Sequence, residues 1–175
     1  MDYEISEPEI GVTGSAWVGH GRRSIWSLVR DSFAKAEREI LIAAYSLSEA
    51  SPEFFNLLDA SLSKGIRILL IINRFSEQPE RAKSSLVMLK KKHNKKFILK
   101  DFNPPDRRED LHAKLIIVDH RSALVGSANL TWKGMIINHE LVIRIKGRHA
   151  SEIGDLVDNL SYYPDTRIIP IEGSG

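Results

Sequence analysis

Four polar side chains in residues 111–130 have the types and the spacing to bind and attack a phosphate group. His112 and Lys114 stand one residue apart at the start of an apolar run, and Ser127 and Asn129 stand one residue apart after the next apolar run. In a β-strand, residues i and i+2 share a face about 6.6 Å apart, so each pair is expected to project to one side. An ammonium group with hydroxyl and amide donors can stabilise a phosphoryl transition state. An imidazole can attack phosphorus or donate a proton.

The order of these residues resembles the signature motif of the phospholipase D superfamily. The motif requires His, any residue, Lys, four residues, Asp, six residues, then Gly-Ser or Gly-Gly, one residue and Asn. His112, Lys114 and Asp119, followed by Gly126-Ser127-Ala128-Asn129, fill this pattern without a departure. Glu140 also matches a glutamate that the family carries downstream of the Asn.

The resemblance implies a two-step phosphodiester transfer that needs no metal ion or other cofactor. His112 would attack phosphorus and form a phosphohistidine, while a second histidine protonates the leaving oxygen and then activates water. Lys114 and Asn129 would hold the non-bridging oxygens of the phosphate, and Ser127 would assist them.

Other residues are expected to support this chemistry. The resemblance implies that Glu140 binds the other ring nitrogen of His112, which keeps the attacking nitrogen unprotonated and correctly aimed. Asp119 is expected to act less directly, by fixing its turn or by tuning a neighbouring histidine. Tyr45 and Ser46, at the end of an earlier apolar run, are expected to line the same pocket.

Taken singly, these residues have ordinary structural explanations. A histidine or lysine at the start of a strand is typical of a solvated surface, and Ser127 and Asn129 are favoured capping residues. The shared spacing is what favours the catalytic interpretation. The remaining histidines occur in no comparable pattern and are interpreted as structural or surface residues: His20, His93, His120, His139 and His149.

The motif occurs once in this sequence, whereas larger members of the superfamily carry it twice. The mechanism requires two histidines, so a second chain is the natural source of the other one. A twofold axis through the pocket would place two copies of His112 across one phosphate. The resemblance to short single-motif members, compact bacterial nucleases among them, therefore predicts a homodimer with a shared active site.

Helical and strand patterns alternate along the chain, which predicts an α/β fold with a mixed sheet covered by helices on both faces. Apolar periodicity and capping signals, such as Ser51-Pro52 before a helix and Gly65 after it, predict four helices. The expected helices cover residues 22–38, 51–64, 79–93 and 149–160. Short apolar runs predict strands over residues 39–46, 66–73, 96–100, 111–118, 122–125 and 139–145. The prolines and charges of residues 101–110 predict a loop.

Length and composition limit the class of protein. A chain of 175 residues with a net charge of +2 is expected to form one domain, with a core of about residues 12–162 and flexible termini. No apolar run approaches the ~20 residues of a membrane helix, and the acidic N-terminus does not resemble a secretory signal. The absence of cysteine excludes disulfides and fits the reducing cytoplasm, where we expect the protein.

A run of lysines, LKKKHNKK at residues 89–96, bears on the substrate. It is either a solvated helix end, since cations suit a helix C-terminus, or a phosphate-binding patch beside the active site. The nucleic-acid-binding interpretation comprises Lys90, Lys91, Lys92, Lys95, Lys96 and Lys133.

Three functions remain open from the sequence. The favoured one is a metal-independent homodimeric nuclease, because no segment has the Trp- and Leu-rich amphipathic face of an enzyme that works on lipid surfaces. Its substrate would be DNA or RNA, with DNA favoured. The second is a phospholipase D or phosphatidyl transferase. The third is a non-catalytic nucleic-acid-binding module of a larger assembly, although binding alone would not require His112.

Overall fold

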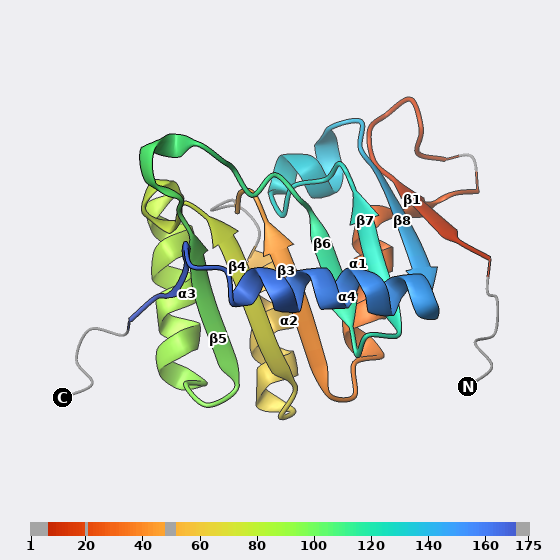
Figure 1. Cartoon of the computed structure of the whole chain (residues 1–175). Coiled ribbons are helices and arrows are strands. Elements are labelled where there is room, and N and C mark those ends of the chain that lie inside the picture. Colours follow the sequence, from red (N-terminus) through yellow and green to blue (C-terminus); the bar gives the residue numbers. More distant parts are fainter. Residues whose placement is uncertain (1–6, 20, 48–51, 171–175) are drawn as a thin grey trace.

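The centre of the molecule is a mixed β-sheet (Figure 1). The structure, a computed structural model, describes residues 7–19, 21–47 and 52–170. Nine strands lie within these residues: β1 Glu9–Val12, β2 Arg23–Ser24, β3 Glu39–Ala44, β4 Arg67–Asn73, β5 Phe97–Phe102, β6 Leu115–Val118, β7 Ser122–Gly126, β8 Leu141–Lys146 and β9 Thr166–Ile168. The helical elements are α1 Ile25–Ala34, α2 Pro52–Ser63, α3 Glu80–Lys92 and α4 Arg148–Ser161, with the short helices η1 Phe75–Glu77, η2 Pro105–Arg107 and η3 Lys133–Ile137.

The strand order determines which strand ends meet. The order is β2-β1-β8-β7-β6-β3-β4-β5-β9. Strands β3, β4 and β5 are parallel to one another, whereas β6 is antiparallel to both β3 and β7, and β8 is antiparallel to both β7 and β1. The carboxyl ends of β1, β3, β4, β5 and β7 therefore lie at the same edge as the amino ends of β6 and β8.

Helices cover both faces of the sheet, so the predicted α/β architecture is confirmed. Helices α1, α2 and α3 lie on one face, and α4 crosses the other (Figure 1). Successive residues of β3 alternate between the two faces: Ile40 and Ile42 pack with α1–α3, while Leu41 and Ala43 pack with α4. Burial of both faces explains why the strands appear in the sequence as continuous apolar runs.

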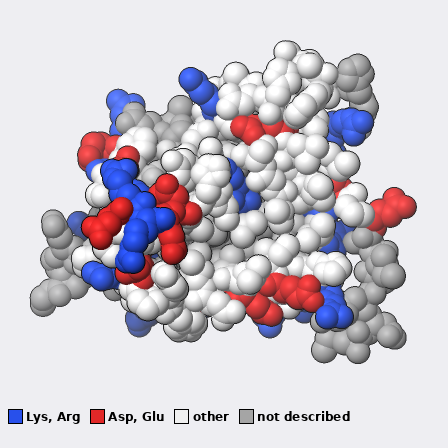
Figure 2. All heavy atoms as spheres, turned by 45° about the horizontal axis from the view of Figure 1, so that its top comes forward, with Lys and Arg blue, Asp and Glu red and all other residues white. Residues whose placement is uncertain are grey.

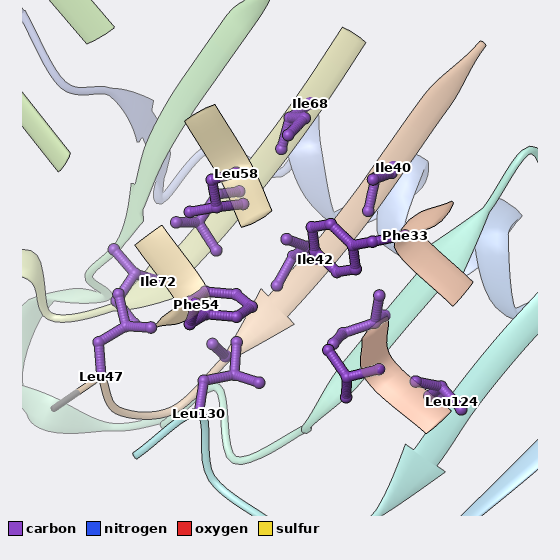
Figure 3. Packing of buried hydrophobic residues seen from close by; sticks show 14 of the residues in the cluster. Phe33, Ile40, Ile42, Leu47, Phe54, Leu58, Ile68, Ile72, Leu124 and Leu130 are labelled. Carbon is purple, nitrogen blue, oxygen red and sulfur yellow. The ribbon is translucent and has the colours of Figure 1, made fainter. Parts of the chain in front are cut away.

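The larger core lies between the sheet and helices α1–α3 (Figure 3). Phe33 of α1 and Phe54 of α2 meet edge to face, with ring centroids 6.0 Å apart. Phe54 and Leu58 are fully buried over the strand residues Ile42 and Ile72. Burying each such side chain contributes about 1.5–3 kcal/mol, so this core fixes the strands whose ends carry polar groups.

Local signals determine the helix ends. Helix α1 begins at Ile25 because the Ser24 Oγ accepts a hydrogen bond from the Ser27 backbone N–H at 3.1 Å. Residues 22–24 are therefore outside the helix, and the prediction of a helix over residues 22–38 is too long. Helix α2 is followed by Gly65 at φ +90, as predicted, whereas the expected N-cap Ser51 lies outside the described residues. No helix that the structure describes is long and apolar enough to cross a membrane.

The predicted long strands are present, but three short ones were not predicted. Strands β1, β2 and β9 contain four, two and three residues, too few for a periodic pattern to stand out. Strand β5 continues to Phe102, into the segment expected to be a loop, and β8 begins at Leu141 rather than at His139.

A buried arginine connects the edge strand β1 to the rest of the molecule. The Arg144 side chain, on β8, is only 3% exposed and donates hydrogen bonds to Glu9 of β1 and Asp31 of α1. The hydrogen bond from Arg144 lowers the pKa of Asp31 to about 2, from the ordinary 3.8. The pKa of Glu9 is also lowered, chiefly by Arg144. A buried guanidinium requires such partners.

The low pKa of Asp31 predicts an acid-sensitive part of the stability. As pH falls from 3.8 to about 2, the unfolded chain binds the proton of Asp31 before the folded chain does. The free energy of unfolding should therefore decrease with falling pH in this window, and Asp31→Asn should be less stable at neutral pH with a shallower dependence below pH 3.8. Urea denaturation at a series of pH values measures both. Parallel pH profiles for the two proteins would contradict the assignment.

Candidate active site

Apart from Asp119, the polar residues of the motif meet at one edge of the sheet, the upper edge in Figure 1. Leu115, at the start of β6, pairs with Ala43 near the end of β3 and with Val125 near the end of β7. Gly126, the last residue of β7, pairs with Val142 near the start of β8. The residues that precede β6, follow β7 and precede β8 therefore meet at this edge.

His112 and Lys114 are in direct contact, although not as neighbours on a strand. Strand β6 begins at Leu115, so the prediction that it begins at Leu111 is wrong. The Lys114 Nζ nevertheless lies 3.1 Å from His112 Nδ1 and donates a hydrogen bond to the His112 carbonyl oxygen at 2.6 Å. His112 is exposed, and its Nε2 makes no hydrogen bond within the described residues. This nitrogen is open to substrate.

Tyr45, directly after β3, lies against both of these residues. Its ring is edge-on to the His112 imidazole, with centroids 4.7 Å apart. The Lys114 Nζ lies 5.2 Å from the centre of the same ring, within the range of a cation–π interaction. Tyr45 thus lines the site, and among the described residues Ser46 makes no hydrogen bond to His112 or Lys114.

Gly126 allows β7 to approach β8 closely at the site. A Cβ atom at this position would overlap the backbone of Leu141 and Val142. The Ser127 backbone N–H donates to the Leu141 carbonyl at 3.0 Å, and the Ser127 Oγ accepts from the Leu141 N–H at 3.2 Å while donating to the Glu140 carboxylate. Ser127 is therefore held by both the backbone and a side chain of the neighbouring segment.

Asn129 is half-buried and carries hydrogen-bonding capacity that the protein does not use. Its side-chain Oδ1 is buried without a partner in the described part of the chain, a situation that costs about 1–3 kcal/mol. The backbone on both sides is fixed, because Ala128 is buried and Leu130 bridges to Leu47. Because Oδ1 is an acceptor, a phosphate oxygen could be held only by the Nδ2 donors of the same amide, for which no partner is found among the described residues.

Lys114 and Glu140 are oppositely charged side chains at this edge of the sheet. Burial lowers the pKa of Lys114, and the nearby Glu140 carboxylate acts in the opposite direction. Glu140 accepts hydrogen bonds from Ser127 and, at 3.4 Å, from Asn138. Among the described residues none of its hydrogen bonds reaches His112, so the structure does not contain the predicted Glu140–His112 pair.

The segment before β6 is held by residues that the sequence analysis did not single out. Asn73, at the end of β4, accepts a hydrogen bond from the Leu111 N–H at 2.9 Å and donates to Asp110 at 3.2 Å. The Arg74 side chain, 6% exposed, donates to Asp110 at 2.9 Å and to the Glu109 carbonyl at 3.0 Å. The bonds from Asn73 and Arg74 lower the pKa of Asp110. These side chains take the place of the strand pairing expected at Leu111.

Gln78 connects the ends of the two central strands. Its buried amide donates to the Asn73 carbonyl at 2.7 Å and to the Tyr45 carbonyl at 3.2 Å, and it accepts from the Leu47 N–H at 3.0 Å. The signal for this network was weak: polar residues directly follow an apolar strand, at the sheet edge where α/β proteins place their sites.

Asp119 lies apart from the other motif residues. It follows β6, whereas Lys114 precedes that strand, and five residues of extended chain span roughly 16 Å. Its buried carboxylate accepts three hydrogen bonds at 2.8 Å, from the backbone N–H groups of Glu37, Arg38 and Glu39. Asp119 therefore joins the end of β6 to the start of β3 and does not reach the phosphate site.

The lysine run of residues 89–96 also lies at the opposite edge, so the prediction of a patch beside the active site is wrong. Helix α3 connects the parallel strands β4 and β5 and must run back across the sheet, so it ends where β5 begins. Lys90 donates to the Phe97 carbonyl at 2.6 Å, and Lys92 pairs with Asp59 at 2.8 Å. Lys91, Lys95 and Lys96 are at the same end, in or just after α3.

Lys133 is the one member of the predicted basic set on the side of the site. It is exposed at the start of η3, four residues after Asn129. Figure 2 shows the face that includes this edge. Lys and Arg side chains are interspersed with Asp and Glu there and form no continuous basic field among the described residues in view.

One group of side chains in the described residues has the spacing to hold a metal ion, namely His120, Asp155 and Asp158. His120 lies in the turn after β6, at the edge opposite His112, with its Nε2 3.2 Å from Asp158 and its Nδ1 3.5 Å from Asp155. A cation bound there would not contact a phosphate at His112.

Comparison with known proteins identifies a family and a relative. A family model described as "Cardiolipin synthase, PLD-like domain" matches residues 29–160, a range that includes the complete motif. The DISARM protein DrmC of Bacillus paralicheniformis is 26% identical over 125 residues. That match covers 71% of this chain and 51% of the relative, so the chain spans about half the length of the curated protein.

Two solved structures share the fold over nearly their whole length. The crystal structure of Nuc, a phospholipase D family member from Salmonella typhimurium, is similar with a TM-score of 0.72 and 21% identity, covering 93% of this chain and 99% of that one. NucT from Helicobacter pylori is similar with a TM-score of 0.69 and 18% identity, covering 87% and 94%. At these identities the likeness concerns the fold.

Removing the carboxylate of Asp119 tests its structural role. Asp119→Asn should lower the free energy of unfolding by about 2–4 kcal/mol. Both carboxylate oxygens of Asp119 accept hydrogen bonds, whereas the side-chain amide of Asn has one oxygen that accepts and a nitrogen that only donates. Asp106→Asn is a matched control, since Asp106 is exposed and has a φ of 59, close to the 54 of Asp119. It should change stability by less than about 0.5 kcal/mol. Equal urea midpoints for the two variants would show that the three bonds contribute nothing.

Proposed function

The chain belongs to the phospholipase D-like family of phosphodiesterases, and from this premise we propose that it is a nuclease acting through a phosphohistidine intermediate. The observation that carries the proposal is the contact between Lys114 and His112 at an exposed edge of the sheet, beside Ser127 and Glu140. A cation, a nucleophile and neutral donors gathered where a phosphate can enter are what phosphoryl transfer requires.

The reaction has two displacements at phosphorus. In the first, Nε2 of His112 attacks, a P–N bond forms, a P–O bond of the diester breaks, and the leaving oxygen takes a proton from a second histidine. In the second, water attacks phosphorus, its proton passes to the second histidine, and the P–N bond breaks. Lys114 and Asn129 hold the non-bridging oxygens, with the Ser127 hydroxyl as a further donor.

The resting contact between Lys114 and His112 supports a role for Glu140 that begins when substrate binds. An ammonium group only donates hydrogen bonds, so the 3.1 Å contact makes Nδ1 an acceptor and leaves the proton of a neutral ring on Nε2. Attack by Nε2 requires the opposite tautomer. A bound phosphate draws Lys114 to its oxygens. Nε2 then gives its proton to solvent while Nδ1 takes one up, and the new Nδ1–H donates to Glu140.

The second histidine comes from a second copy of the chain. The other histidines that the structure describes have partners elsewhere: His93 contacts Asp59, His120 contacts Asp158, His139 accepts from the Ala16 N–H, and His149 contacts Glu152. A twofold axis through the site supplies a second His112. Trp132 and Ile137, exposed apolar residues near Asn129, offer a partner chain a surface to bury.

Nucleic acid is the proposed substrate, with DNA favoured over RNA. The chain has the size of the short single-motif members of the family, and it matches Nuc and NucT nearly end to end. Lys133 and Arg22 are exposed and make no hydrogen bond or ion pair within the described residues, so both are available to phosphates.

We predict cleavage that persists in excess EDTA and is abolished by His112→Ala. The nucleophile is a side chain, so no metal-bound water is required. Plasmid, single-stranded DNA, RNA and phosphatidylcholine vesicles should be tested in parallel, with cleavage of a nucleic acid expected. His149→Ala is the control, because His149 is an exposed histidine on α4, on the far face of the sheet, and its variant should keep full activity.

Each alternative has its own outcome in that experiment. Activity lost on chelation and restored by Mg²⁺ would rule out the mechanism. Activity on vesicles alone would replace the nuclease by a phospholipase. Binding of nucleic acid without cleavage would identify a non-catalytic module.

Mixing experiments test the shared site. Wild-type chains are re-equilibrated with an equal amount of His112→Ala chains. The mixture should have about a quarter of the activity of pure wild-type protein at the same total concentration, because every mixed dimer lacks one histidine. Activity should fall with the square of the wild-type fraction, measured by initial rates at constant total protein. A linear decrease, or full activity from a monomer in sedimentation, would contradict the model and make His139 the next candidate for the acid.

A further inference from the structure

A cavity borders the same edge of the sheet, and none of the motif residues lines it. It has a volume of about 370 Å³ and is lined by Val12, Ala16, Trp17, Arg22 and Leu141. Val12 and Leu141 are paired across β1 and β8, and Leu141 directly follows Glu140. The cavity is therefore a lateral extension of the candidate active site, of a size that holds a small ligand or part of a larger one.

The indole that lines this cavity is held in place while remaining accessible. The Trp17 backbone N–H donates to the Gly14 carbonyl at 3.1 Å, and the backbone N–H of the neighbouring Ala16 donates to His139 Nε2 at 3.2 Å. The Trp17 ring meets the His139 ring edge-on, with centroids 5.4 Å apart. Trp17 is nevertheless 41% exposed. A fixed, exposed aromatic face loses little entropy when a flat ligand stacks on it.

A free cation completes the cavity. Arg22 is exposed and makes no hydrogen bond or ion pair within the described part of the chain. An aromatic face with an adjacent guanidinium is the combination by which proteins hold an unpaired base and its phosphate. A duplex keeps its base faces stacked and cannot offer them to Trp17.

We propose that the cavity of Trp17 and Arg22 binds an unpaired nucleobase and a neighbouring phosphate of a single-stranded nucleic acid whose scissile phosphate lies at His112. The inference rests on the proposed nuclease function and adds the strand state of its substrate. Strand β1 is three positions from β6 in the sheet, so the two sites are about 14 Å apart, a few nucleotides of extended chain. The interspersed charges of this face leave stacking as the main source of affinity (Figure 2).

The test uses a series of single-stranded oligonucleotides, each with one abasic position placed at a different nucleotide. Binding is measured by fluorescence anisotropy with full-length His112→Ala protein, which does not cut the probe. One abasic position, a few nucleotides from the scissile phosphate, should weaken binding about 10-fold, within the range for loss of one stacked base. In the His112→Ala/Trp17→Ala protein the same abasic position should have no further effect, because the two changes remove one contact.

Matched variants sharpen the result. Tyr162→Ala removes another exposed aromatic side chain, 84% exposed at the end of α4, and it should leave the response to the abasic position intact. Trp17→Phe should retain most of the binding that Trp17→Ala loses. Arg22→Gln should reduce the slope of the logarithm of the binding constant against the logarithm of the salt concentration by about one. Thermal melting of each variant checks that it is folded.

The outcomes separate this inference from the function on which it rests. The protein could cleave nucleic acid while the effects of the abasic position and of Trp17→Ala on binding are additive at every position. That result would contradict base binding in the cavity and leave the proposed nuclease function intact. Tighter binding of duplex than of single strand, or loss of self-association without a base-specific effect in Trp17→Ala, also contradicts base binding in the cavity. If wild-type protein neither binds nor cuts any nucleic acid, the inference and the proposed function fail together.

Discussion

The antiparallel pairing of β6 between β3 and β7 is the constraint on which the site depends. Side chains of β6 alternate between two cores, with Ile116 and Val118 in one and Ile117 in the other. A slip of one residue would turn each of them to the opposite face, so the register is fixed by burial on both sides. The carboxylate of Asp119 secures the far end of the strand to the start of β3. Lys114, which immediately precedes β6, is thereby placed with little freedom.

The near end of the strand is held differently, by side chains rather than by a ladder of backbone hydrogen bonds. Asn73 and Arg74 bind the segment that leads to His112, and Gln78 binds the segment that carries Tyr45. In the proposed mechanism His112 accepts a phosphoryl group, which requires it to remain exposed, and an exposed end of a strand cannot be fixed by packing. Buried polar side chains from β4 and the loop after it supply that rigidity, as preorganised catalysis requires.

The sequence predicts the motif residues of this site more fully than the side chains that hold them in place. The motif spacing brings His112, Lys114 and Ser127 to one edge, and alternating patterns predict the α/β fold, because both features follow from local periodicity. The partners of Asn73 and Glu140 depend on side-chain orientations between segments far apart in the chain, which no local pattern records.

The position of the lysine run follows from the order of helices and strands in the sequence. A helix between two parallel strands returns to the edge where the second strand begins, so the cations after Leu89 had to lie opposite the carboxyl ends of the strands. The composition of the run indicates a phosphate-binding patch, whereas its position in a β-α-β unit determines the edge of the sheet at which it lies. Strand boundaries are less well predicted from the sequence, since the apolar Leu111 precedes β6 without belonging to it.

The proposed mechanism requires His112 to form a covalent bond to phosphorus. The direct measurement is to mix wild-type protein with an oligonucleotide that carries labelled phosphates, quench within a turnover in alkaline denaturant, and map the labelled peptide by mass spectrometry. The account predicts a label on His112 that is stable to alkali, labile to acid and absent from the His112→Ala protein. Rapid cleavage with no labelled intermediate at any quench time, or a label on another residue, would contradict it.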